Sequence, residues 1–209
     1  MPDLWIKICG LRAAGDVAAA VAAGADALGF VFYEPSPRHL ALEAACALQT
    51  VVPPGVERVA VFLHPSQAQV DAVIDGLRPD WLQTDLEDLA GLRLPRGQRV
   101  LPVLRSGGGR KIGSEPNFAR MMLEGGTSGQ GVRADWSGAR ALAARCELVL
   151  GGGLDAGNVA VAIRTVRPFG VDVSSGVERA RGVKDPARIR EFISEARRAH
   201  RGLTKEAKA

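Results

Sequence analysis

The chain has 209 residues, of which 46% are hydrophobic, and 27 basic against 23 acidic residues give it a net charge of +4. This length suits one α/β domain with a substantial core, so we expect a single domain over residues 1–209, with 202–209 as a frayed C-terminal tail. The basic excess gathers near the C-terminus, as is typical of a solvated helix face, and six Phe, three Trp and one Tyr leave few rings for base stacking. We therefore expect no nucleic-acid partner.

Three cysteines, Cys9, Cys46 and Cys146, are present. Their spacing fits no metal site, and their odd number suits reduced thiols in the cytoplasm. The N-terminal sequence MPDLWIKICG has no signal-peptide pattern, and no apolar run reaches membrane-spanning length. We expect a cytoplasmic protein with no bound metal and no membrane partner.

Short apolar segments alternate along the chain with segments of helical period. The predicted strands are 5–9, 27–32, 58–63, 81–84, 99–104, 120–123, 147–150 and 170–173. The predicted helices lie within 16–25, 40–51, 66–77, 135–146, 158–166 and 185–199. Asp185 is expected to cap the last helix, with Pro186 at its first position.

This alternation indicates eight strand–helix units. Continuously apolar strands favour a parallel sheet covered by helices, so we predict an α/β protein that forms a single (β/α)8 TIM barrel. The fourth and fifth units are the weakest, because 86–96 is short for a helix and 105–117 has the composition of an exposed loop. Alternation does not demonstrate closure, so a doubly wound open sheet is the alternative.

Two glycine-rich turns follow the last two predicted strands. The first holds Gly152 and Gly153, and the second holds Ser174, Ser175 and Gly176. In barrels of this kind the corresponding loops commonly bind a substrate phosphate. Tight turns alone would also explain the glycines, but two such turns after consecutive strands favour a phosphate-binding site.

Other polar side chains lie where predicted strands end, which is the edge of a barrel that carries chemistry. Cys9 ends the first strand, Arg38 follows the second, Glu124 follows the sixth and Asp172 lies in the eighth. A thiol and carboxylates at one mouth suit general acid–base catalysis. Lys7 faces the same side of its strand as Cys9 and is expected to lower the pKa of the thiol. The alternative is that Cys9 is only a small core residue, as a lone cysteine in an apolar strand more often is.

Several of these segments resemble one family, the phosphoribosylanthranilate isomerases of tryptophan biosynthesis. The resemblance rests on IKICGLR at 6–12, GADALGFVFYEPSPRHL at 24–40, VAVF at 59–62, SGQGVRADW at 128–136 and the glycine turns with GVKD. It implies an Amadori rearrangement of N-(5-phosphoribosyl)anthranilate to 1-(2-carboxyphenylamino)-1-deoxyribulose 5-phosphate. It implies no cofactor and no metal, and it leaves open a monomer or a homodimer.

The resemblance also implies roles for individual residues. Cys9 would be the general base that removes the C2 proton, and Glu124 the general acid that protonates the ribose ring oxygen. Arg38 would bind the anthranilate carboxylate, and Asp172 the sugar. Lys7 and Gln83 are further candidates for substrate contact, and the two turns would bind the phosphate.

The chain departs from the family pattern at two places. It has Met122-Leu123-Glu124 where the family usually has Leu-Leu-Asp, and Leu82-Gln83-Thr84-Asp85 where the family commonly has Gln-Leu-His-Gly. A glutamate acid is one methylene longer, and contacts from the fourth strand are altered. A pentose-phosphate epimerase, a histidine-pathway isomerase and a non-catalytic phosphate-ligand binder are the alternatives.

Overall fold

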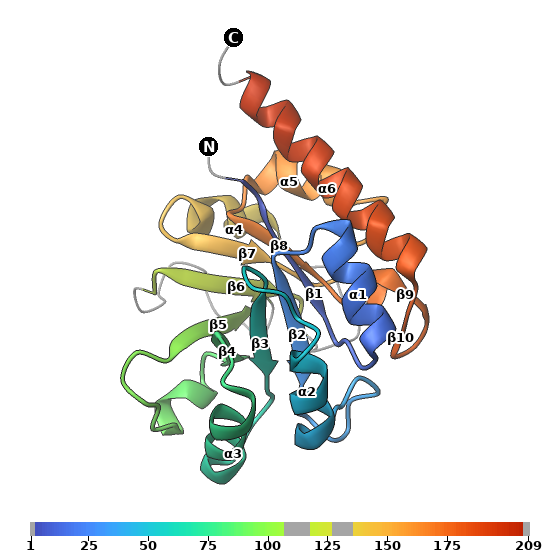
Figure 1. Cartoon of the computed structure of the whole chain (residues 1–209). Helices are drawn as coiled ribbons and strands as arrows, with labels where there is room; N and C mark the ends of the chain where they lie inside the picture. The colour runs from blue at the N-terminus through green and yellow to red at the C-terminus, as the bar shows by residue number, and fades with distance from the viewer. Residues whose placement is uncertain (1–2, 107–117, 127–135, 207–209) are drawn as a thin grey trace.

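Eight parallel strands form a closed barrel in the computed structural model, which describes residues 3–106, 118–126 and 136–206 (Figure 1). In chain order they are β1 (Trp5–Cys9), β2 (Ala27–Val31), β3 (Glu57–Val61), β4 (Trp81–Asp85), β5 (Arg99–Arg105), β6 (Arg120–Glu124), β7 (Glu147–Leu150) and β8 (Gly170–Val173). Each predicted strand is present within a residue or two of its expected ends. The fold prediction is therefore confirmed.

Pairing between the first and last strands closes the barrel. β1 and β8 are parallel, with Trp5 opposite Gly170 and Lys7 opposite Asp172. Because an open sheet would leave these two strands unpaired, the doubly wound alternative is wrong.

Helices surround the barrel (Figure 1). They are α1 (Ala14–Ala23), α2 (Leu42–Gln49), α3 (Gln67–Leu77), α4 (Trp136–Ala143), α5 (Val159–Val166) and α6 (Pro186–Glu206). The fourth unit has only the 3-10 turn η1 (Asp88–Gly91), as its short segment indicated. Most of the predicted loop 105–117, and Asp135 before α4, lie outside the described residues.

The last helix packs along α5 and α1 (Figure 1). It begins at Pro186, and the side chain of Asp185 accepts hydrogen bonds from the backbone N–H groups of Ala187 at 2.8 Å and Arg188 at 3.3 Å, which confirms the predicted cap. The helix continues into the expected tail as far as Glu206, where Leu203 is buried against the core. Residues 207–209 lie outside the described part.

Alternate residues of each strand point into the barrel. Its interior toward the beginnings of the strands is one apolar cluster, made of Trp5, Ala27, Val59, Trp81, Leu101, Val103, Met122 and Val149. Because side chains on a strand alternate with a period of two, the same faces further along carry Lys7, Gln83, Arg105, Glu124 and Asp172. The polar residues of the interior therefore gather where the strands end.

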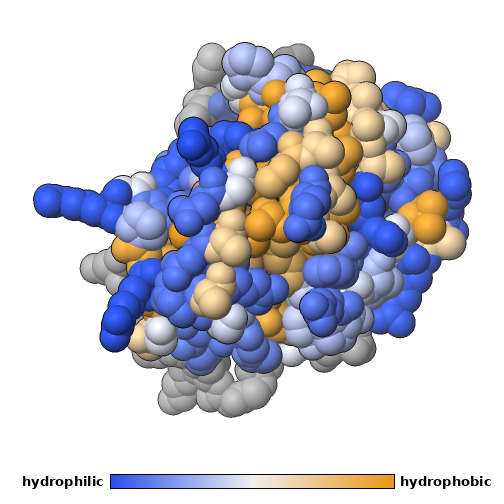
Figure 2. All heavy atoms as spheres, turned by 60° about the horizontal axis from the view of Figure 1, so that its bottom comes forward, coloured by the Kyte–Doolittle hydropathy of each residue, from blue (hydrophilic) through white to orange (hydrophobic). Residues whose placement is uncertain are grey.

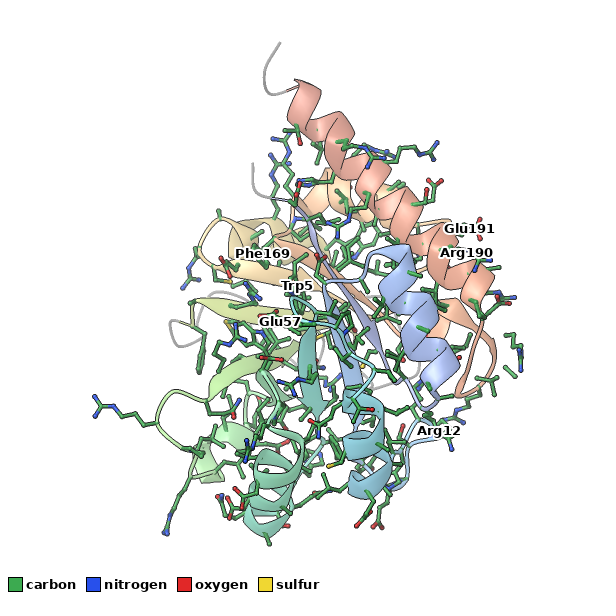
Figure 3. All side chains as sticks on the ribbon, viewed as in Figure 1. Trp5, Arg12, Glu57, Phe169, Arg190 and Glu191 are labelled. Carbon is green, nitrogen blue, oxygen red and sulfur yellow. The ribbon has the colours of Figure 1, made fainter. Side chains whose placement is uncertain are left out.

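A cluster of rings and charges closes the opposite end, where the strands begin. The guanidinium of Arg120 lies over the rings of Trp5, Trp81 and Phe169, at 5.2, 4.6 and 4.2 Å from their centroids. The indole N–H of Trp5 donates to Glu57 at 3.0 Å, and Figure 3 shows Trp5, Glu57 and Phe169 close together. Packing at this end stabilises the barrel and leaves the other end for function.

The end of the molecule at the bottom of Figure 1 carries the loops that follow the strands. Turned toward the viewer in Figure 2, it presents a band of hydrophobic surface bordered by hydrophilic residues. No helix among the described residues is both long and apolar enough to cross a membrane.

Candidate active site

A buried ion pair joins the first and last strands at the functional end of the barrel. The ammonium of Lys7 donates to Asp172 at 2.7 Å, and their side chains are 0% and 5% exposed. Burial alone would lower the pKa of Lys7, but Asp172 and Cys9 raise it, so the lysine is charged. The pair places a cation and a carboxylate beside the Cys9 thiol, as the spacing of Lys7 and Cys9 predicted.

Two glycines make room for predicted site residues, one for Cys9 and one for Arg38. A Cβ at Gly29 on β2 would lie 2.9 Å from the sulfur of Cys9 and 3.1 Å from Cε of Lys7. Gly10 has φ +77°, and a Cβ there would lie 2.6 Å from Cδ of Arg38. A larger side chain at either position would displace a predicted site residue.

The electrostatics of Cys9 differ in one respect from the sequence prediction. Burial raises the pKa of the thiol and is the largest effect; Lys7 and Lys184 lower it, and Asp172 raises it further. Lys7 thus acts in the predicted direction, but the expected net lowering is wrong for the ligand-free protein, because desolvation outweighs the neighbouring cations.

Glu124 lies at the end of β6, next to Gly151, which directly follows β7, and close to Asp172 on β8. A Cβ at Gly151 would lie 2.6 Å from Cε of Met122, 3.2 Å from Cγ of Glu124 and 3.6 Å from a carboxylate oxygen of Asp172. Gly151 therefore leaves space for the side chains of both Met122 and Glu124. Burial and Asp172 raise the pKa of Glu124, while Arg105 and Lys7 oppose the rise, and the net shift is upward. A raised pKa makes the carboxyl group better suited to carry the proton that a general acid donates.

Two residues near Glu124 were missed by the sequence analysis. Arg105, at the end of β5, donates to Glu124 at 2.5 Å and to Asp85, at the end of β4, at 2.6 Å. The period of two along each strand could have placed both residues inside the barrel at the ends of their strands. It does not reveal which charged side chains pair across neighbouring strands.

Arg38 is held by a second network that sequence reasoning also missed. Its Nε and one terminal nitrogen donate to the two oxygens of Glu178 at 2.7 and 2.9 Å, and Lys184 donates to the same carboxylate at 2.9 Å. Arg38 is 4% exposed and Lys184 is 2% exposed. Glu178 and Lys184 belong to the segments GVE and GVKD, far from Arg38 in the sequence. The fold brings them close to Arg38, in the loop that follows β2.

The two glycine turns meet at the ends of neighbouring strands. Gly152 and Gly153 have φ values of +78° and +64°, which glycine adopts without strain. Gly176 lies in the 3-10 turn η2 (Ser175–Val177), and a Cβ there would be 2.0 Å from the carbonyl oxygen of Leu154. The second turn thus packs directly on the loop that follows the first.

The serines of the second turn differ in their contacts. The Ser174 hydroxyl donates to the carbonyl oxygen of Cys9 at 3.1 Å, which ties this turn to the end of β1. Ser175 is partly exposed at the start of η2.

Gln83 lies on β4 and is 3% exposed. Its side-chain oxygen is buried and has no hydrogen-bond partner within the described part of the chain. A buried polar atom in this state is costly unless something satisfies it.

Among residues 3–106, 118–126 and 136–206, no group of three or more His, Cys, Asp or Glu side chains is arranged to hold a metal ion. A thiol, two carboxylates and a lysine meet in the barrel mouth beside two glycine turns. The fold and the site together define a (β/α)8-barrel protein whose mouth carries groups suited to acid–base catalysis.

Comparison with known proteins identifies the family. The sequence model described as N-(5'-phosphoribosyl)anthranilate (PRA) isomerase matches residues 6–195, and this chain belongs to that family. It is 42% identical over 202 residues to the N-(5'-phosphoribosyl)anthranilate isomerase of Thiobacillus denitrificans, with 92% of this chain and 97% of that protein covered. It is 38% identical to the Pseudomonas aeruginosa enzyme of the same name, with 98% and 100% covered.

Solved structures agree with this result. The crystal structure of phosphoribosyl anthranilate isomerase from Thermotoga maritima superimposes with a TM-score of 0.81 at 33% identity, covering 92% of this chain and 98% of that one. A phosphoribosyl anthranilate isomerase in complex with reduced 1-(o-carboxyphenylamino)-1-deoxyribulose 5-phosphate superimposes with a TM-score of 0.79, at the same identity and coverage.

Proposed function

We propose that this protein catalyses the Amadori rearrangement of N-(5-phosphoribosyl)anthranilate to 1-(2-carboxyphenylamino)-1-deoxyribulose 5-phosphate in tryptophan biosynthesis. The observation that carries the proposal is the meeting of Cys9, Glu124 and the Lys7–Asp172 pair in the mouth of one barrel. Membership of the family, and a relative's complex with a reduced form of the product, support it.

The two proton transfers are assigned to Glu124 and Cys9. Glu124 gives its proton to the ribose ring oxygen as the bond between that oxygen and C1 breaks, which leaves an iminium between C1 and the anthranilate nitrogen. Cys9, after its thiol has lost its proton to solvent, takes the C2 proton as a thiolate, and the electrons of the C2–H bond form an enolamine. Burial favours the protonated Glu124, and Lys7 stabilises the thiolate of Cys9.

Substrate contacts are assigned to the surrounding polar groups. Arg38, oriented by Glu178 through its Nε and one terminal nitrogen, would bind the anthranilate carboxylate. Asp172 and Lys7 would contact the sugar or the developing intermediate. Gln83 would accept a hydrogen bond from the substrate, which would satisfy its buried oxygen.

The phosphate is assigned to the turns after β7 and β8, with Gly152 and Gly153 in the first and Ser174, Ser175 and Gly176 in the second. Their direct packing supports one shared anion site. Holding the substrate at its phosphate and at its carboxylate positions C2 and the ring oxygen for the two proton transfers.

The remaining assignments concern the protein as a whole. We infer that residues 1–209 form one domain that acts in the cytoplasm as a monomer or a homodimer and requires no metal or cofactor. A related enzyme from Thermotoga maritima is described as dimeric. All three cysteines are free thiols, which supports a reducing compartment.

The test adds the purified protein to freshly generated phosphoribosylanthranilate and follows the loss of anthranilate-type fluorescence. We expect rapid decay that is abolished by Cys9→Ala and by Glu124→Gln, while both variants still bind the product. Full activity of Glu124→Gln would refute the acid assignment. No decay with the wild-type protein, despite phosphosugar binding, would favour the non-catalytic ligand binder instead.

A further inference from the structure

The side chain of Arg105 contacts one residue from each of the two places where the chain departs from the family pattern. Glu124 stands where the family usually has aspartate, and Asp85 lies in the altered segment of β4. Arg105 contacts both. Its Nε lies 3.1 and 3.2 Å from the two oxygens of Asp85, one terminal nitrogen lies 2.6 Å from Asp85, and the other lies 2.5 Å from Glu124.

The barrel register produces this contact. Arg105 pairs with Glu124 across β5 and β6, and Asp85 pairs with Val103 across β4 and β5. All three charged side chains therefore point inward from consecutive strands. Their side chains are only 12–18% exposed, so water screens the interactions weakly.

We propose that Arg105 is the positioning residue of Glu124, and that Asp85 holds Arg105 in place and shares its charge. This inference rests on the proposed function and assigns a task to two residues outside the predicted site. A planar guanidinium with two donor edges suits this task. One edge can fix the carboxyl group of Glu124 while the carboxylate of Asp85 holds the other edge in place.

The charges around Glu124 explain why Asp85 is needed. Arg105 from β5 and Lys7 from β1 favour the carboxylate, whereas burial and Asp172 from β8 favour the protonated acid. Gly151, which directly follows β7, also borders Glu124 and carries no charge. With Asp85 removed, the whole charge of Arg105 would act on Glu124 and would lower its pKa.

Further charges lie on the far side of Asp85. The imidazole of His64 is 2.9 Å from Asp88, and Asp88 accepts a hydrogen bond from Thr84 at 2.9 Å. Asp85 raises the pKa of His64 and Arg105 lowers it, although Asp88 has the larger effect. His64 is exposed and pairs with Asp88, so the buried partners of Arg105 remain Asp85 and Glu124.

The experiment compares Asp85→Asn and Arg105→Gln with the wild-type enzyme by two readouts. The first is the pKa of Glu124, from a carboxyl-carbon NMR titration in which Glu124→Gln identifies the signal. The second is kcat, from the fluorescence decay. Asp80→Asn is the matched control, because Asp80 pairs with Arg58 just before β4 begins, at the opposite end of the barrel.

We expect Asp85→Asn to lower the pKa of Glu124 by about one unit and Arg105→Gln to raise it. We expect kcat to fall about tenfold or more in Arg105→Gln, where the acid is no longer held, and Asp80→Asn to match wild type within about twofold. Arg105→Lys separates charge from orientation. It should keep the pKa of Glu124 near the wild-type value and still lower kcat, because an ammonium cannot hold both carboxylates in fork geometry.

Three results would overturn the proposal: an unchanged Glu124 pKa in Asp85→Asn, an unchanged kcat in Arg105→Gln, or full activity in Arg105→Lys. If Arg105→Gln does not fold, Asp85→Asn and Arg105→Lys decide the question by the same readouts. Wild-type activity is measured first, because an inactive wild type would refute the proposed function, whereas an active wild type with unaffected variants refutes only this inference.

Discussion

Replacing Glu178 with glutamine should weaken the protein in a way that depends on pH. The Glu178 carboxylate accepts hydrogen bonds from Arg38, Lys184 and the backbone N–H of Gly182, at 2.7–3.0 Å, and the residue is 6% exposed. Glutamine keeps the shape of the side chain but removes the charge, which leaves two buried cations without their anion. Breaking a buried ion pair in this way is strongly destabilising.

The magnitude follows from the pKa of Glu178. Burial alone would raise it, but Arg38, Lys184 and Gly182 lower it from the ordinary 4.5 to about 2. At about 1.4 kcal/mol per pKa unit, this difference corresponds to about 3 kcal/mol of stability at neutral pH. Because the pKa is depressed in the folded state, that contribution is present above the unfolded value of 4.5 and is lost as pH falls toward 2.

The assay is urea unfolding of the wild type and Glu178→Gln at pH 7, 5, 4 and 3. The difference in unfolding free energy should be constant from pH 7 to about 5 and should shrink by up to about 3 kcal/mol as pH falls toward 2. Glu191→Gln, on the exposed face of α6 (Figure 3), is the matched control and should leave the curve unchanged. Parallel stability curves for wild type and Glu178→Gln would refute the reasoning.

Three further predictions test other parts of the molecule. Gly151→Ala should lower kcat about tenfold by crowding Met122 and Glu124, and the loss should be smaller in a Glu124→Asp background, where one of these two side chains is shorter; equal losses in both backgrounds would contradict a contact with Glu124. Gln83→Leu should raise KM while leaving the unfolding free energy equal or higher, since it removes an unsatisfied buried oxygen; an unchanged KM would exclude a substrate contact. Arg120→Met should cost about 2 kcal/mol of stability in urea unfolding with kcat unchanged, and a loss of kcat in the folded variant would contradict a purely structural role.

Local sequence patterns were sufficient for the strands and most helices. The strands are short apolar runs, so their positions follow from side-chain burial, and the start of α6 follows from Asp185 and Pro186. The fourth unit was identified as weak because too few helix-forming residues separate β4 from β5. The expected C-terminal tail is helical to Glu206, because Leu203 packs on the core, a tertiary contact that composition does not reveal.

Cys9, Glu124 and Asp172 were predicted site residues because each lies at or near the end of a strand. In a parallel barrel every strand ends at the same mouth, so position along the chain predicts position in the site. Gly152, Gly153 and the Ser174–Gly176 turn were identified for the same reason. Their assigned contacts with substrate remain predictions.

The partners of those residues depended on the tertiary structure. Arg105 is 20 residues from Asp85 and 19 from Glu124, and Arg38 is 140 residues from Glu178. No local pattern relates such distant side chains, because barrel closure and strand register determine which of them meet. Burial in the closed barrel is also the largest cause of the raised pKa values of Cys9 and Glu124. Sequence therefore identified the chemical groups at the barrel mouth, whereas their pairing and their charge followed from the closed barrel, since both depend on distance and desolvation.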